Sequence, residues 1–234
     1  MKIGIIGAIE QEVEALKAIM ENTKIETVSS VEFCSGKING ADTVVAAAGV
    51  GKVNAAVCAQ SMILTYSPDV IINVGAAGGL SPRLEIGDIA VASSVVEHDM
   101  DTTPIGDPRG LISGIDKVYM ECDKNIAALM ENAAKSIGLN SEMGVIASGD
   151  QFISSQEQRD FIIGEFNAIA AEMEGASIGH VCTMNNVPFG VLRAISDGAN
   201  SDSVMDYPTF AKLAAENSVK IIVYMLGEIS NEKN

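Results

Sequence analysis

The sequence predicts a single α/β domain in which helices cover both faces of a central, mixed, largely parallel β-sheet. Short β-branched runs alternate with longer helical patterns, Gly or Asp marks the joins, and several strand candidates are apolar on both faces. The 234 residues suit one such domain, and the chain contains no evident linker, repeat or low-complexity segment. We expect the domain to span residues 1–229 and residues 230–234 to form a frayed tail.

The strand candidates are short runs rich in Val, Ile and Ala. The run Val70–Val74 has apolar side chains on both faces, as expected for a strand buried between two layers of helices. In chain order, the predicted strands are Lys2–Gly7, Val28–Cys34, Thr43–Ala48, Val70–Val74, Ile89–Val96, Gly144–Ala147, Ala168–Ala171 and Phe189–Ile195.

The helix candidates show apolar residues at helical spacing. In the first of them, Val13, Leu16 and Met20 fall on one face, at i, i+3 and i+7. The predicted helices are Glu10–Met20, Val53–Tyr66, Lys124–Ser136, Ser155–Ile163, Gly175–Met184 and Tyr207–Ile229. The segment Asp99–Gly114 lacks periodicity and is rich in Gly, Pro and Asp, which is typical of a functional or interface loop.

Charge and cysteine content exclude several classes of partner. The 31 acidic residues outnumber the 15 basic ones, and the net charge of −16 repels nucleic-acid phosphates and anionic lipid. The N-terminal apolar run reaches Glu10 too early for a signal peptide, and no uncharged stretch suits a membrane span. We therefore expect a cytoplasmic protein that binds a small molecule. The four cysteines lack metal-site spacing, which predicts reduced thiols and no metal.

Several familiar catalytic motifs are absent. The segment Gly49–Lys52 resembles the end of a P-loop, but Val53 stands where Ser or Thr is required, so nucleoside triphosphate hydrolysis is not expected. The sequence contains no GxGxxG motif. His180, in an apolar helix, is interpreted as structural rather than catalytic.

Acidic residues stand at the ends of three predicted strands. Glu12 follows the first strand, Glu172 and Glu174 follow the seventh, and Asp197 follows the eighth. In open α/β sheets, ligands bind outside the carboxyl ends of the strands, so these side chains should share one rim. An isolated acidic residue at such a place usually complements a helix dipole. Three positions on one rim favour the acid–base pair that cleaves a glycosyl bond.

Two further features suit a purine ligand. Residues 75–79 (GAAGG) would let a ligand approach bare backbone, although a tight turn has the same composition. Phe152 lies in a polar Gly/Asp loop and could stack on a base, while a core position is equally compatible with the sequence.

Seven motifs in order carry a family resemblance: IGIIGAIEQEV, GVGKVNAA, NVGAAGGL, GDIAVASSVVEHDMD, SGDQFI, AEMEGASIGHVC and VLRAISDGA. Together they resemble the bacterial 5′-methylthioadenosine/S-adenosylhomocysteine nucleosidases of the purine nucleoside phosphorylase-like superfamily, over residues 1–229. The resemblance implies a three-layer fold and no cofactor. It also implies hydrolysis of the N9–C1′ bond of these nucleosides, and of 5′-deoxyadenosine, to adenine and a ribose derivative in methionine salvage.

The resemblance implies roles for individual residues. Glu12 matches the general base that deprotonates water, and Asp197 matches the general acid at adenine N7, with Ser196 holding its carboxylate. Met173 and Glu174 match the ribose-binding pair.

Five further substrate contacts are implied in the same way. Phe152 would stack on the purine, Ile153 would read its edge through the main chain, and Gly78 would lie against the substrate. Arg193 would lie near the water and the base, and Tyr207 would line the 5′-alkylthio pocket.

Hydrolysis is favoured over phosphorolysis. A phosphorylase needs cationic side chains around phosphate. This chain has four arginines, none within the first 82 residues, and its N-terminal loop carries Glu10, Glu12 and Glu14. A purine nucleoside phosphorylase and an aminofutalosine-type nucleosidase of the same superfamily remain alternatives.

Two departures from the family pattern leave substrate preference open. Ala76 stands where some relatives have Ser, and Ile105 stands where some have an aromatic residue. The resemblance also implies a homodimer in which the 99–114 loop reaches the partner's site.

Overall fold

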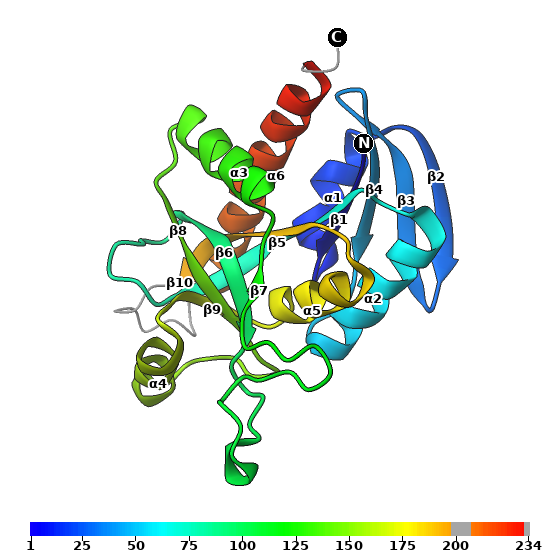
Figure 1. The fold of residues 1–234 in the computed structure, drawn as a ribbon. Helices are drawn as coiled ribbons and strands as arrows, with labels where there is room; N and C mark the ends of the chain where they lie inside the picture. Colours follow the sequence, from blue (N-terminus) through cyan, green and yellow to red (C-terminus); the bar gives the residue numbers. More distant parts are fainter. Residues whose placement is uncertain (198–206, 232–234) are drawn as a thin grey trace.

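The structure is a computed structural model that describes residues 1–197 and 207–231, except for the side chains of residues 207–209, 211 and 231. It confirms the predicted α/β class: a mixed, ten-stranded sheet lies between layers of helices (Figure 1). The strands are β1 (Lys2–Gly7), β2 (Glu21–Val28), β3 (Val31–Ile38), β4 (Ala41–Ala47), β5 (Val70–Gly79), β6 (Ile89–Glu97), β7 (Met120–Glu121), β8 (Ser141–Ser148), β9 (Ala168–Glu172) and β10 (Phe189–Asp197).

The helices fall into groups on the two faces of the sheet. They are α1 (Glu10–Ala18), α2 (Lys52–Tyr66), α3 (Lys124–Ser136), α4 (Gln156–Phe166), α5 (Gly175–Asn185) and α6 (Tyr207–Asn231), with a 3₁₀ turn η1 (Thr103–Ile105). Helices α1, α3 and α6 share one apolar core with the sheet, and α2 and α5 share the other. Helix α4 packs separately over β8 and β9. No helix among the described residues has the length and apolar character needed to cross a membrane.

Part of the sheet closes on itself. Strand β10 pairs with both β5 and β6, so that β5, β9, β8, β6 and β10 form a ring. The centre of the sheet is parallel, with β1 between β4 and β5 and with β5 beside β10. Closure removes the free edge that β10 would otherwise have and brings the ends of β5, β9 and β10 together.

The predicted strand Val28–Cys34 is wrong as a single element. Val28 ends β2, Val31 begins β3, and Ser29 and Ser30 form the turn between them, with φ of 51° and 63°. Two positive φ values match the right-handed twist of a two-residue hairpin. Most of β2 is exposed, so it lacks the apolar pattern that would have predicted it.

The glycine-rich segment after Val74 is strand rather than turn. Residues 75–79 continue β5, pairing with β10 and then with β9. The register sets Gly78 opposite Asp197. At the other end of the chain, α6 extends to Asn231, two residues beyond its predicted end at Ile229.

Candidate active site

A cavity lies at the carboxyl ends of β1, β5, β9 and β10. Glu12 and Asp197 both line it, so the two acidic side chains on which the predicted chemistry depends face the same space. Every residue predicted for the site lines this cavity except Arg193, which lies behind it, and Tyr207, whose side chain is outside the described part of the structure. The lining residues are Ala8, Ile9, Glu12, Val50, Ala76, Ala77, Gly78, Gly79, Leu80, Gln151, Phe152, Ile153, Arg159, Ala171, Glu172, Met173, Glu174, Ser196 and Asp197.

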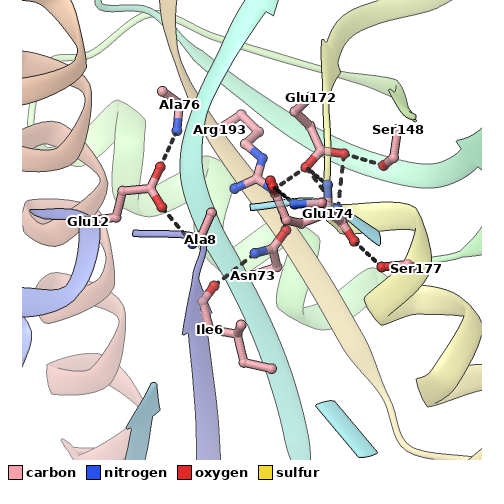
Figure 2. Close-up of polar contacts among 12 residues, drawn as sticks. Ile6, Ala8, Glu12, Asn73, Ala76, Ser148, Glu172, Glu174, Ser177 and Arg193 are labelled. Atoms are coloured by element: carbon pink, nitrogen blue, oxygen red, sulfur yellow. Dashed lines mark hydrogen bonds and ion pairs between the residues drawn. The ribbon is translucent and has the colours of Figure 1, made fainter. Parts of the chain in front are cut away.

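Backbone N–H groups fix the Glu12 carboxylate. Helix α1 begins directly after β1, and Glu12 in its first turn turns back toward the strand. One carboxylate oxygen accepts from the N–H of Ala8 at 2.7 Å and of Ile9 at 3.1 Å, and the other accepts from the N–H of Ala76 at 3.1 Å (Figure 2). Because residue 76 contributes its main chain, the alanine there leaves this contact intact.

Gly75 is needed for this arrangement because of close packing. A Cβ atom there would lie 2.4 Å from Nη1 of Arg193 and 2.7 Å from Oε1 of Glu12. Such separations are far inside van der Waals contact, so any side chain at residue 75 would push Glu12 or Arg193 aside.

Arg193 joins two buried glutamates beneath the cavity. Its guanidinium is wholly buried in β10, forms an ion pair with Glu172, and lies 3.5 Å from Oε2 of Glu174 (Figure 2). Asn73 accepts a further hydrogen bond from it. Burial alone would raise the pKa of Glu172, but the charge of Arg193 and hydrogen bonds from Ser148 and the α5 N-terminus hold that pKa below its usual value.

The pKa of Glu174 is shifted in the opposite direction to that of Glu172. Burial and the neighbouring charge of Glu172 raise the pKa of Glu174 to about 7, although Arg193 opposes the shift. The N–H of Gly51 donates to its Oε1 at 2.9 Å. A carboxyl group that faces a cavity and changes charge near neutral pH can accept hydrogen bonds from a ligand's hydroxyls once it is ionised.

Burial and two neighbouring polar groups set the pKa of Asp197. It is buried at the end of β10, and this burial raises its pKa, while Ser196 and Arg159 partly offset the rise. The Ser196 hydroxyl donates to Oδ1 at 2.9 Å, and Nη2 of Arg159 lies 3.6 Å from Oδ2.

The loop with Phe152 is tied to the start of α2. Phe152 lines the cavity and is 48% exposed, which excludes the core position that the sequence left open. Asp150 accepts from the Lys52 backbone N–H at 2.8 Å, and its own N–H donates to Asp99 at 2.9 Å. The Lys52 ammonium lies 2.7 Å from Asp99 and 2.8 Å from Glu97. The P-loop-like segment therefore helps to position the loop that carries Phe152.

Sequence reasoning missed two residues that contact the charged groups of the site. Arg159 gave no local signal, because a charged residue near a helix start is ordinary. Asn73 had one: it is a polar residue in an otherwise apolar buried strand, and its amide donates to the Ile6 carbonyl at 2.8 Å while accepting from Arg193. Among the described residues, no three His, Cys, Asp or Glu side chains are grouped to hold a metal ion.

Comparisons with known proteins show the family to which the chain belongs. The model of the phosphorylase superfamily matches residues 2–227, and the chain belongs to that superfamily. A 5′-methylthioadenosine/S-adenosylhomocysteine nucleosidase from Geobacillus thermodenitrificans is 35% identical over 99% of both chains, and one from Shewanella loihica is 38% identical over 97% of this chain and 99% of the relative. Within the superfamily, the chain is therefore a member of the 5′-methylthioadenosine/S-adenosylhomocysteine nucleosidase family.

Solved structures of a nucleosidase of this family and of a futalosine hydrolase both superpose closely on this chain. The Neisseria meningitidis nucleosidase in complex with methylthio-immucillin-A superposes with a TM-score of 0.93 at 34% identity, over 97% of this chain and 99% of that one. A futalosine hydrolase from Helicobacter pylori superposes with a TM-score of 0.92, also at 34% identity, over 97% and 98% of the two chains.

Proposed function

We propose that this chain hydrolyses the N9–C1′ bond of 5′-methylthioadenosine and S-adenosylhomocysteine, releasing adenine and the 5-thioribose derivative. The single observation that carries this proposal is that one cavity holds both Glu12, fixed by three backbone N–H donors, and Asp197, whose burial raises its pKa. Family membership supports the same reaction.

Cleavage needs an acid for the departing base and a base for water. As the N9–C1′ bond breaks, positive charge grows on the sugar and the purine gains electrons. Asp197 donates its proton to N7 of the purine, and Glu12 accepts a proton from the water whose oxygen bonds to C1′. The ionised Glu174 accepts hydrogen bonds from the ribose hydroxyls, and its charge stabilises the cationic sugar. Phe152 stacks on the base, and Ile153 reads its edge through the main chain.

The charge of the cavity supports water as the nucleophile. Among the described lining residues, Arg159 is the one cationic side chain, and it faces Asp197. Arg193 is engaged by Glu172 and Glu174, so its charge is already balanced. Adenine release assayed with and without phosphate tests this: equal rates are expected, whereas strict phosphate dependence would overturn the hydrolase assignment. Turnover of aminofutalosine in preference to methylthioadenosine would favour the futalosine-type alternative suggested by the Helicobacter pylori neighbour.

The acid assignment is tested with Asp197→Asn. Loss of a positioned acid typically lowers turnover by ~10²–10⁴-fold. The amide keeps the shape of the side chain, so calorimetry should still detect binding of a transition-state analogue. Undiminished turnover in this variant would remove Asp197 from the reaction.

We further propose a homodimer in which the 99–114 loop reaches the partner's site. Helix α2 presents Val53, Val57 and Leu64 to solvent, with Leu64 74% exposed, and α5 adds Met184. The 99–114 loop, green in Figure 1, projects below the sheet, and Ile105, which ends its 3₁₀ turn η1, is 81% exposed. A clustered apolar surface of this kind favours an interface. Sedimentation should give a dimer that Leu64→Glu converts to a monomer, and a monomeric wild-type protein would refute the proposal.

The proposed location is the cytoplasm. All four cysteines are buried and none forms a disulfide, as expected in a reducing compartment.

A further inference from the structure

Arg159 is a buried charge at the edge of the cavity. It lies in the first turns of α4, directly after the loop that holds Phe152, and is only 4% exposed. Ser155 fixes the start of this helix: its hydroxyl accepts from the Gln158 N–H at 3.2 Å, and its carbonyl accepts from the Arg159 N–H at 3.2 Å. The backbone that carries Arg159 is therefore held rigidly against the cavity wall.

The guanidinium of Arg159 faces the proposed acid. Its Nη2 lies 3.6 Å from Oδ2 of Asp197, and both side chains are only 5% exposed. Among the described lining residues, the other ionisable groups are Glu12 from α1 and Glu172 and Glu174 at the end of β9, with Arg193 compensating the latter two. In the described structure, Arg159 is thus the cation that pairs with Asp197.

Arg159 stabilises the ionised form of Asp197 more than the neutral form. A neutral carboxyl group interacts weakly with a guanidinium, whereas the carboxylate left after proton donation attracts it strongly at this separation. An interaction that strengthens as the reaction proceeds stabilises the transition state more than the ground state.

We propose that Arg159 is a positioning residue that stabilises the Asp197 carboxylate as it forms and so sets the strength of the acid. The inference rests on the proposed function, because it assumes that Asp197 donates the proton. Arg159 opposes the rise in the Asp197 pKa that burial causes. Burial thus favours the protonated form of Asp197, and Arg159 makes Asp197 a better proton donor than burial alone would allow.

The pH profile of turnover tests this role with Arg159→Gln. Activity requires protonated Asp197 and is lost as the pH rises through its pKa. Removing a neighbouring cation raises that pKa, so the alkaline limb should move to higher pH by about 1 unit. On the plateau, kcat should fall by up to about tenfold, because one pKa unit is a tenfold change in acid strength. Arg159→Lys retains the charge, so both the position of the alkaline limb and the plateau kcat should return toward the wild-type values.

Controls separate this role from a merely structural one. Arg83→Gln removes the same charge from an exposed pair with Glu142, outside the cavity, and should leave the profile unchanged. Arg159→Met fills the space without a charge and carries the same test if the glutamine variant does not fold. Lower kcat with an unmoved alkaline limb in a folded neutral variant would refute the proposal. That outcome is distinct from full activity in Asp197→Asn, which would refute the proposed function itself.

Discussion

Replacing Arg193 by Met should destabilise the fold strongly. Arg193 and Glu172 each expose 1% of their side chains, and Glu174 exposes 7%, so removing the guanidinium leaves two acidic groups buried without their cation. Breaking a buried pair in this way costs about 3–5 kcal/mol. For a chain of this size, each kcal/mol lowers Tm by roughly 2–4 °C, which predicts a fall of about 6–20 °C.

Thermal unfolding followed by circular dichroism measures this loss, with Arg83→Met as the matched control. The Arg83 side chain is 78% exposed, and an exposed pair of this kind with Glu142 contributes about 0–1 kcal/mol. The pH dependence supplies a second check. Without Arg193, the pKa of Glu172 rises above its unfolded value, so the stability deficit should shrink as the pH falls through that range. A Tm close to wild type at both acidic and alkaline pH would show that the buried cluster does not need its cation.

Three further predictions concern the cavity. Gly75→Ala should lower kcat more than it raises KM, because the new methyl group displaces Glu12; steady-state kinetics equal to wild type would contradict the close packing found there. Lys52→Met should raise KM by about tenfold, because the partly buried Asp99 would lose its ammonium partner and loosen the Phe152 loop at a cost of ~1–3 kcal/mol; an unchanged KM would argue against that tie. Affinity for a ribosyl inhibitor should weaken as the pH falls through about 7, where Glu174 gains a proton. Calorimetry should find this dependence absent in Glu174→Gln, and a dependence that persists there would assign the titration to another group.

The sequence predicted the acidic residues that line the cavity better than it predicted the residues that hold them in place. Strand ends are local features, so the positions of Glu12, Glu174 and Asp197 on one rim followed from the α/β pattern, and the structure places all three around one cavity. From the sequence, Phe152 could be assigned only to either the cavity or the core, because composition does not specify which way a side chain points. The exposed strand β2 was missed for a related reason: its stability comes from pairing with β3 rather than from an apolar pattern.

Tertiary structure alone decided which charges balance one another. Arg193 meets Glu172 from 21 residues away, and Arg159 on helix α4 meets Asp197 at the end of strand β10. Closure of the sheet through β10 sets Gly78 beside Asp197 and brings Gly75 against both Glu12 and Arg193. Periodicity records which face of an element is buried but carries no information on which distant element covers it. Burial and charge pairing, which set the pKa values of the site, therefore emerge only when the chain is folded.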